Sequence, residues 1–538
     1  MSTEVVRRVI FRDATIHDGL GGDPVRGDLL VHGDTIVAVG DLGPDAAADV
    51  DDVVEVDGRV LAPGFIDMHS HSDLQVLSAP DHTAKLTQGV TLEVLGQDGL
   101  SYAPVDDVTL PVLRSRLAGW NDDPEGFDWS WRTVAEYLDR LDRSTAVNTA
   151  YLVPHGTLRM LVMGDEARCP DADELDRMRI LLRRALDDGA AGLSAGLTYV
   201  PGMFADTDEL VELCRVVAEY GGYFSPHHRN YGSAVIAGYQ ECVEIARRSG
   251  VALHLAHAHL SFEVNRGRLA ELLAVLDSAT ADGVDLSFDS YPYLAGMTTL
   301  ASQLPGWAQA GTPEEQLARL TDTGTRVRII EALDVTGSDG HQGLTVDWST
   351  VRVVGVPGAP EYDDVVGIGL AEAARSRGTT PAALCLDVLA ATRLGAPCVI
   401  FIGIEEHVRA LMAHPAHTVG SDGILVGDRP HPRSWGTFPR ILETYVREQG
   451  VLSLSEAIRH MTSAAAARLR LTDRGRIAVG AKADLVVFDP DTVHENATYD
   501  CPRQASDGIL HVMVNGEFAL RDGEVTGART GRVVGALR

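Results

Sequence analysis

Short runs in which apolar and polar residues alternate dominate both ends of the chain. Near the N-terminus they include RRVIFRDATIHDG and GDLLVHGDTIVAVGDL, and near the C-terminus ILHVMVNGEFALRDGEV follows the same pattern. Alternation that is interrupted by Gly and Asp turns is typical of β-strands with one buried face. We therefore expect residues 1–62 and 475–538 to form one small β-sandwich together.

Between about residues 63 and 474, short apolar runs alternate with helical segments such as DELDRMRILLRRALDDG and TDELVELCRVVAEYGG. This alternation predicts a parallel α/β fold. Eight of the apolar runs are candidate inner strands, and they end near GFIDMHSH, TLEVLG, NTAYLVPHG, AAGLSAGL, YFSPHHR, LHLAHAH, DLSFDSYPY and HTVGSD. Eight strand–helix units predict a (β/α)8 TIM-like barrel.

More than a hundred residues separate the seventh of these runs from the eighth. They contain PEEQLARL, STVRVVGV and TPAALCLDVLAAT, which have the character of further helices and strands. An ordinary connection in a barrel is far shorter. We expect an inserted subdomain or lid at about residues 300–400.

Composition excludes several kinds of partner. The net charge is −31, and binding to nucleic acid or to anionic membranes requires clustered Lys and Arg, so we expect neither. No apolar stretch is long enough to span a bilayer and the first residues do not resemble a signal peptide, so we expect a cytoplasmic protein. The six cysteines include no C-x-x-C pair, which argues against a thiolate zinc cluster.

Unusual polar residues gather where the predicted strands end, which is the catalytic edge of such barrels. They are His69 and His71 on the first strand with Asp67 behind them, His227 and Arg229 on the fifth, His257 and His259 on the sixth, and Asp422 on the eighth. A single histidine in such a place is often an ordinary hydrogen-bonded core residue. Four strand ends together indicate a site for Zn²⁺ or another borderline divalent metal, with Asp422 as ligand and proton shuttle.

Longer motifs resemble those of a known family. They are APGFIDMHSHSD, GVTLEVLGQDG, VPHGTLR, GAAGLSAGLTYVPGMFADTDEL, HHRNYG, DSYPYLAGMTTL, VGSDG, HPRSWGTFPR and DRGRIAVGAKADLVVFDPDTV, in family order along nearly the whole chain. The chain is similar to the amidohydrolase superfamily, and within it to the N-acyl-D-amino-acid deacylase (D-aminoacylase) family. The resemblance implies a (β/α)8 barrel with a β-sandwich from both termini, and hydrolysis of an N-acyl amide by metal-bound hydroxide.

The resemblance also implies roles for single residues. His69 and His71 match one metal subsite, His227 and His257 match the other, and Asp422 matches the catalytic aspartate. The expected cofactor is Zn²⁺ in one or two sites, with Mn²⁺ or Co²⁺ as alternatives. The expected partner is a small N-acyl carboxylate substrate. The sequence is also compatible with a homo-oligomer.

Two positions depart from the family pattern. The family has Gly-Asn-Cys-Gly where this chain has GQDG, so Asp98 replaces a cysteine that ligates zinc. His259 replaces a lysine that helps to hold the substrate carboxylate. Many relatives also bridge two metals with a carboxylated lysine, but the only lysines here are Lys85 and Lys482, and neither lies at a strand end. Asp98 is the best-placed bridging carboxylate, whereas Glu93 sits too early in its strand and should lie below the rim.

Substrate contacts are expected from Tyr291, Tyr293 and Arg433, which match family positions, and from His259 and Arg229. Arg433 can pair with a carboxylate through two hydrogen bonds, although it can equally bridge to an acidic neighbour, and the tyrosines can simply brace a loop. His155, at the end of the third strand, can stabilise the oxyanion or serve a structural role.

The leading hypothesis is therefore an N-acyl-D-amino-acid deacylase. A cyclic-amide hydrolase or a deaminase of the same superfamily is the alternative, but neither carries the VPHGTLR and HPRSWGTFPR motifs. A non-catalytic metal-binding protein is a third class, which Asp422 beside the metal ligands disfavours.

Overall fold

The eight predicted inner strands form one parallel sheet that closes into a barrel, which confirms the predicted (β/α)8 fold. The computed structural model describes residues 7–535. In chain order the strands are β6 (Phe65–Asp67), β7 (Val90–Leu95), β8 (Asn148–Pro154), β9 (Gly192–Gly196), β10 (Tyr223–His227), β11 (Ala252–Leu255), β12 (Leu286–Ser290) and β16 (His417–Val419). The barrel closes where the Met68 N–H donates to the Val419 carbonyl at 3.0 Å. Because the strands are parallel, their carboxyl ends share one rim.

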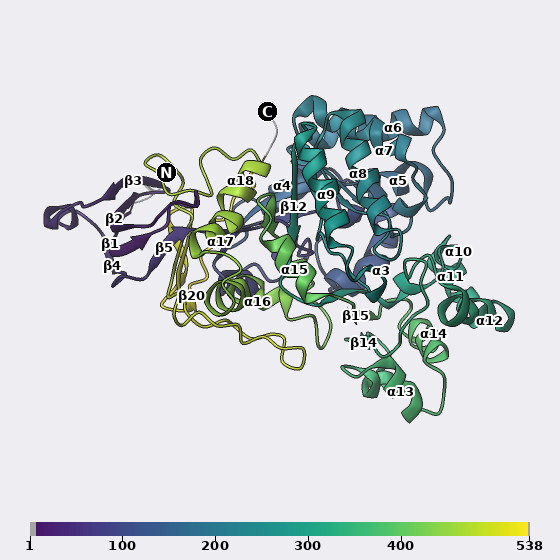
Figure 1. Cartoon of the computed structure of the whole chain (residues 1–538). Coiled ribbons are helices and arrows are strands. Elements are labelled where there is room, and N and C mark those ends of the chain that lie inside the picture. The colour runs from purple at the N-terminus through teal and green to yellow at the C-terminus, as the bar shows by residue number, and fades with distance from the viewer. Residues whose placement is uncertain (1–6, 536–538) are drawn as a thin grey trace.

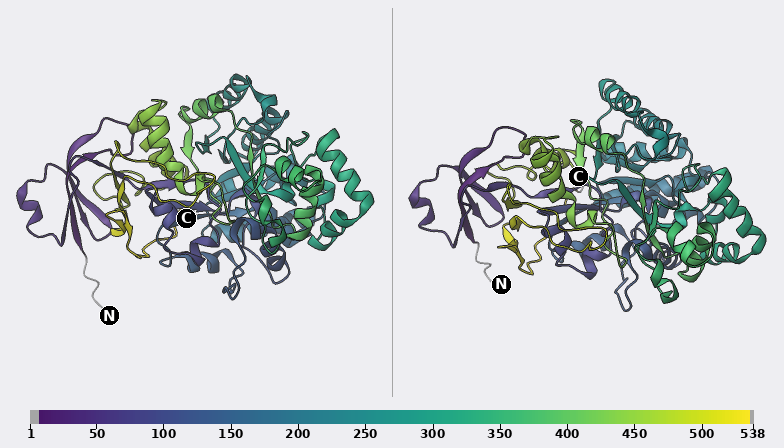
Figure 2. Two further views of the ribbon diagram at one scale, coloured as in Figure 1. Left: turned by 90° about the horizontal axis from the view of Figure 1, so that it is seen from below. Right: turned by 60° about the horizontal axis from the view of Figure 1, so that its bottom comes forward.

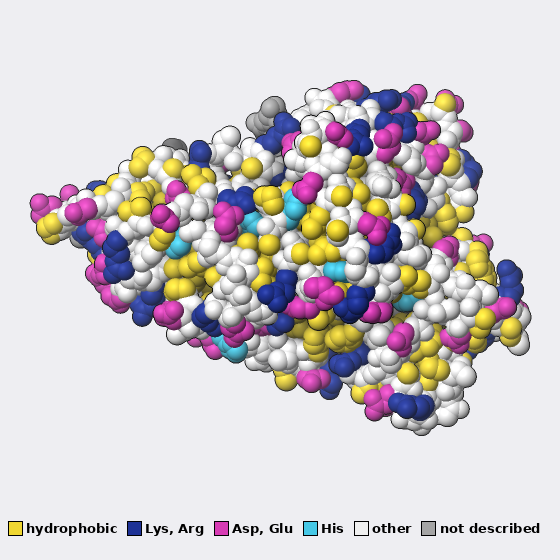
Figure 3. Space-filling model, in the orientation of Figure 1, with side chains coloured by type: hydrophobic (Ala, Val, Ile, Leu, Met, Phe, Trp, Pro, Cys, Tyr) yellow, Lys and Arg dark blue, Asp and Glu magenta, His cyan; other side chains and the backbone are white. Residues whose placement is uncertain are grey.

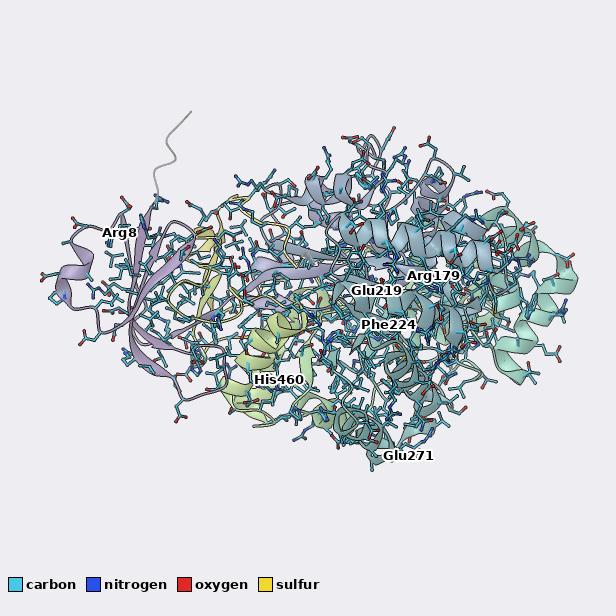
Figure 4. All side chains as sticks on the ribbon, turned by 90° about the horizontal axis from the view of Figure 1, so that it is seen from above. Arg8, Arg179, Glu219, Phe224, Glu271 and His460 are labelled. Carbon is cyan, nitrogen blue, oxygen red and sulfur yellow. The ribbon has the colours of Figure 1, made fainter. Side chains whose placement is uncertain are left out.

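Helices cover the outside of the barrel (Figure 1). They include α3 (Thr109–Asn121), α4 (Val134–Leu141), α5 (His155–Met163), α6 (Ala172–Asp187), α7 (Thr207–Tyr220), α8 (Val235–Ser249), α9 (Leu269–Ala281), α15 (Glu405–Met412) and α16 (Arg433–Arg440). α6 begins at a capping box, in which Asp171 accepts from the Glu174 N–H at 2.8 Å. Figure 4 labels Arg179 on α6 and Glu219 on α7, and ion pairs such as Arg183–Glu219 join these two helices.

Strands from both ends of the chain form one nine-stranded sheet, as the purple and yellow segments of Figure 1 show. Its strands are β1 (Arg8–Ile16), β2 (Val25–His32), β3 (Thr35–Gly40), β4 (Asp52–Glu55), β5 (Val60–Pro63), β17 (Leu485–Phe488), β18 (Ile509–Val514), β19 (Glu517–Arg521) and β20 (Glu524–Val525). The rings of Phe11 on β1 and Phe518 on β19 lie 6.0 Å apart, although three strands separate β1 from β19. The sheet therefore curls on itself and encloses the expected sandwich-like core.

The terminal sheet and the barrel are connected in two further ways. α17 (Leu454–Met461) and α18 (Ser463–Arg468) lie between them, and in Figure 4 His460 of α17 lies between Arg8 of the sheet and Phe224 of the barrel. Near the C-terminus, the N–H of Val534 donates to the carbonyl of Thr149 on β8 at 2.8 Å. The last described residues thus pair with a barrel strand, whereas we expected residues 475–538 to belong to the sandwich.

The expected insertion between the seventh and eighth barrel strands is present at the edge of the molecule (Figure 2). It contains a three-stranded antiparallel sheet of β13 (Ala295–Thr299), β15 (Pro397–Phe401) and β14 (Val351–Val353). Its helices are α10 (Gly306–Gln309), α11 (Pro313–Thr321), α12 (Thr323–Glu331), α13 (Leu370–Ser376) and α14 (Pro381–Ala391). Buried apolar residues of the insertion, such as Leu300, Trp348 and Leu389, form a core of their own.

The visible face of the molecule mixes charges of both signs, and acidic and basic side chains lie interspersed over it (Figure 3). Among residues 7–535, no helix is both long enough and apolar enough to cross a bilayer.

Candidate metal centre and active site

The turn after β7 places Asp98 at the rim of the barrel. Gly96 and Asp98 both have left-handed backbone, with φ of 76° and 54°. Position 96 requires glycine, because a Cβ there would lie 2.1 Å from the carbonyl oxygen of Leu152. A non-glycine residue in this conformation costs roughly 1–2 kcal/mol, and Asp98 is also 3% exposed. These two properties distinguish Asp98 from an ordinary solvent-exposed turn residue.

Two groups of possible metal ligands share the carboxylate of Asp98. In the first, its oxygens lie 3.6 Å from Nε2 of His69 and 3.7 Å from Nε2 of His71. In the second, they lie 3.2 Å from Nδ1 of His227 and 3.5 Å from Nε2 of His257. Within each group all the ligand atoms lie within 4.8 Å of one another. Asp98 therefore lies between two histidine pairs.

This set of buried donors fits one or two divalent cations. Nε2 of His69 and Oδ1 of Asp98 lack a hydrogen-bond partner among the described residues. Buried polar atoms seldom lack a partner in folded proteins, and a cation bound between these residues would engage them. Imidazole nitrogen and carboxylate oxygen are ligands that zinc, cobalt and manganese accept. The residues thus fit the metal centre that the sequence predicts.

Asp422 lies beside this centre, after the end of β16. Its Oδ1 is 3.1 Å from Nε2 of His71, and its Oδ2 is 2.7 Å from the guanidinium of Arg433. Burial alone would raise the pKa of Asp422, but the Arg433 guanidinium and the nearby histidines hold it well below its usual range. Arg433 also lies over the ring of Tyr291 at 4.6 Å. Asp422 is therefore ionised and oriented at neutral pH.

Asp289 on β12 is a functional residue that the sequence reasoning missed. Its carboxylate accepts from the backbone N–H of His257 at 2.9 Å, and lies 3.1 Å from Nε2 of His254 and 3.6 Å from Nδ1 of His69. It is fully buried. Carboxylates that contact the second nitrogen of a histidine ligand orient the imidazole. The sequence does indicate a special role for this residue at the strand end DSYPY, because an acidic residue is unusual within a buried barrel strand.

Two further contacts orient the second histidine pair. The hydroxyl of Tyr231 lies 3.0 Å from Nδ1 of His257, and the hydroxyl of Thr198 lies 2.7 Å from Nε2 of His227. Each contact leaves the other ring nitrogen directed at Asp98. The orientation of both rings is therefore set by residues outside the ligand group.

A cavity opens onto the metal centre and contains three of the predicted substrate residues. Tyr291, Tyr293 and His259 line it, together with His71, Asp98 and Asp422. The hydroxyl of Tyr293 donates to Glu495 at 2.5 Å. Burial lowers the pKa of His259 to about 3, and the neighbouring His257 adds to the effect. His259 is therefore neutral and does not supply the charge of the family lysine. Arg433 lies behind Asp422 and Tyr291.

Two predicted residues are held away from this cavity. His155 begins α5, and its Nε2 lies 2.7 Å from the carboxylate of Glu209 on α7. Arg229 lies two residues beyond the end of β10, and its guanidinium pairs with Glu241 at 2.9 Å. Neither lines the cavity. Both side chains thus pair with glutamates outside the cavity lining, and their expected roles at an oxyanion and at a substrate stay predictions.

The placement of the two lysines agrees with the sequence analysis. Lys85 lies on α2 (Thr83–Leu86), fully buried, and its ammonium group contacts Asp67 rather than the metal ligands. Lys482 forms a partly exposed ion pair with Asp34. Glu93 is buried below the rim and contacts His82 at 2.8 Å. No lysine among the described residues is thus placed to bridge two metals.

Comparison with known sequences gives one family over most of the chain. Residues 52–519 match the description "Amidohydrolase family". The N-acyl-D-glutamate deacylase of Alcaligenes xylosoxydans xylosoxydans is 38% identical over 511 residues, which cover 94% of this chain and 92% of that enzyme. The D-aminoacylase of the same organism is 35% identical over 528 residues, which cover 98% and 97%.

A solved structure gives the same result. The N-acyl-D-glutamate deacylase of Bordetella bronchiseptica, complexed with zinc and a phosphonate that mimics the tetrahedral intermediate, is similar with a TM-score of 0.83. It is 33% identical, and the similarity covers 98% of this chain and 99% of that chain. The likeness therefore includes the barrel, the terminal sheet and the insertion.

Proposed function

Since the chain belongs to the amidohydrolase family, we propose that it hydrolyses the amide bond of N-acyl-D-amino acids, releasing a carboxylate and a D-amino acid. The observation that carries the proposal is the position of Asp98 between two histidine pairs, with Asp422 3.1 Å from His71, at the base of a cavity. Similarity to N-acyl-D-amino-acid deacylases along nearly the whole chain supports it.

The metal would be held by His69, His71, Asp98, His227 and His257. A bound divalent cation supplies two effects, since it lowers the pKa of a water molecule and polarises an amide carbonyl. We propose Zn²⁺, with Mn²⁺ or Co²⁺ as alternatives because carboxylate oxygen also suits harder ions than a thiolate does. Asp98 belongs to both ligand groups and would serve where many relatives have a carboxylated lysine.

Asp422 is the residue that moves the proton. Arg433 occupies its Oδ2, whereas Oδ1 lies 3.1 Å from Nε2 of His71, on the side of the metal ligands, where it would accept a proton from the attacking water. Asp422 then delivers that proton to the departing nitrogen of the amide, as general acid catalysis requires. Arg433 contacts both Asp422 and the ring of Tyr291, which lines the cavity. Arg433 therefore connects the position of Asp422 to one wall of the cavity.

The α-carboxylate of the substrate would be bound by neutral donors. Nε2 of His259 is buried without a hydrogen-bond partner among the described residues, and it lies in the cavity wall beside Tyr291, with ring centroids 4.3 Å apart. A neutral imidazole N–H and a phenol O–H can each donate to a carboxylate. The guanidinium of Arg433, behind Tyr291, adds a positive charge nearby.

The test is a rate comparison on metal-loaded, full-length protein. We would measure kcat/KM for four kinds of substrate: N-acetyl-D-amino acids, their L enantiomers, a hydantoin and an aminopyrimidine. We expect the N-acetyl-D-amino acids to be the best substrates. A higher kcat/KM for the hydantoin or the aminopyrimidine would assign the site to another reaction, and a preference for L enantiomers would contradict the stereochemistry.

A further inference from the structure

The walls of the cavity beyond the metal centre are largely apolar. They are formed by the segment after β11, by β13 and β15, and by loops of the insertion. Their apolar side chains are Phe262, Leu294, Met297, Ile400 and Ile402. Among the described residues that line the cavity, none is Lys or Arg. The two carboxylates in the lining, Asp98 and Asp422, belong to the metal centre and its proton transfer.

The polar groups on these walls are uncharged. Ser302, Gln303 and Gln342 of the insertion carry no charge, and Nδ1 of His341 lies 2.5 Å from the side-chain oxygen of Gln303. Burial lowers the pKa of His341 to about 4, so its imidazole is neutral at pH 7. The insertion therefore contributes hydrogen-bonding groups to the cavity but no cation.

The nearby arginines are each directed elsewhere. Arg352 stacks on Phe401 at 4.6 Å, and because side chains alternate along a strand, Phe401 faces away from the side of Ile400. Arg229 pairs with Glu241. Arg433 pairs with Asp422 and stacks on Tyr291, where its charge would attract the α-carboxylate of the substrate.

Building on the proposed function, we propose that this cavity accepts N-acyl-D-amino acids with neutral, mainly apolar side chains and discriminates against D-glutamate and D-aspartate. A side-chain carboxylate placed among Phe262, Met297 and Ile402 would lose its water without gaining a cation, which is strongly unfavourable. An apolar side chain would instead bury its surface against the same residues. On this proposal, the similarity to a D-glutamate deacylase does not extend to the choice of side chain.

Substrates that differ in one charge test this proposal. N-acetyl-D-glutamine and N-acetyl-D-glutamate have nearly the same shape, and N-acetyl-D-leucine adds an apolar reference. With metal-loaded, full-length protein we expect kcat/KM for D-glutamate to be on the order of 100-fold below that for D-glutamine, with D-leucine highest. Equal or faster turnover of D-glutamate would overturn this inference and leave the proposed function intact. Turnover of none of the three would contradict the proposed function itself.

Two variants test whether the missing cation causes the discrimination against D-glutamate. Ile402→Lys introduces a cation into the wall, and Ile402→Met conserves the size and apolar character of a half-buried side chain. We expect Ile402→Lys to raise the ratio of D-glutamate to D-glutamine turnover several-fold and Ile402→Met to leave it unchanged. Thermal unfolding of both variants checks that they fold. An unchanged ratio in folded Ile402→Lys would show that the missing cation does not set the preference.

Discussion

The ammonium group of Lys85 lies 2.5 Å from Oδ2 of Asp67, and both side chains are fully buried. The other oxygen of Asp67 accepts from the backbone N–H of His69 at 3.2 Å and of Ser421 at 2.8 Å. Ser421 precedes Asp422, so this pair connects the first and last barrel strands next to His69 and Asp422.

Replacing Lys85 by Met should therefore destabilise the protein strongly. Removing one partner leaves the Asp67 charge buried without compensation, which costs about 3–5 kcal/mol. The free energy of unfolding, measured with denaturant, gives the loss. Lys482→Met is a matched control, because its ion pair with Asp34 is partly exposed and should contribute no more than about 1 kcal/mol. Equal effects of the two substitutions would refute the structural role of Lys85.

Removing the carboxylate of Asp98 should empty the metal centre. Asp98→Ala deletes the only residue common to both ligand groups, so we expect lower metal content and loss of activity together. Metal analysis of the purified variant measures the content, and Asp500→Ala, at an exposed position, is the control. Full metal content and full rate in Asp98→Ala would show that Asp98 is not a ligand.

The chemistry of Asp98 should also widen metal selectivity. Carboxylate oxygen accepts harder ions that a thiolate disfavours, so the wild type should be active after reconstitution with Zn²⁺, Mn²⁺ or Co²⁺. Asp98→Cys should narrow this range towards Zn²⁺. Activity of the wild type with Zn²⁺ alone would contradict the prediction.

Asp422→Asn should separate catalysis from metal binding. Asp422 lies outside both ligand groups, so the variant should retain most of its metal. An amide cannot shuttle the proton, and kcat should fall by about 10²–10⁴-fold, the usual contribution of general acid–base catalysis. Steady-state kinetics at matched metal content decide the point. A variant that loses its metal in proportion to its rate would make Asp422 primarily a ligand.

Glu93 should make stability depend on pH at the acidic end. Burial alone would raise its pKa, but His82 and Lys85 lower it from 4.5 to about 2. Its stabilising contribution, about 3 kcal/mol, should be complete above pH 4.5 and lost as the pH falls from there towards 2. In Glu93→Gln the free energy of unfolding should therefore vary less over that interval than in the wild type. The exposed Glu125→Gln is the control and should retain the wild-type slope.

The sequence predicted which residue types gather at the strand ends, but not where each side chain points. His69 and His71 lie beyond the end of β6 at Asp67, and both reach the carboxylate of Asp98. Arg229 lies two residues beyond the end of β10 and pairs with Glu241 instead. His155 likewise begins a helix, and its direction is set by Glu209 on a different helix.

What the sequence by itself determined is the barrel, its eight strands and the insertion, because these follow from local periodicity; the family motifs indicated the histidines at the strand ends. Only the tertiary structure decided that Asp98 lies between two histidine pairs, that Asp289 orients His69 and that Arg433 pairs with Asp422. These relationships join residues from different strands and loops. Their geometry depends on barrel closure and on competition among buried charges for partners, neither of which is encoded in any short segment.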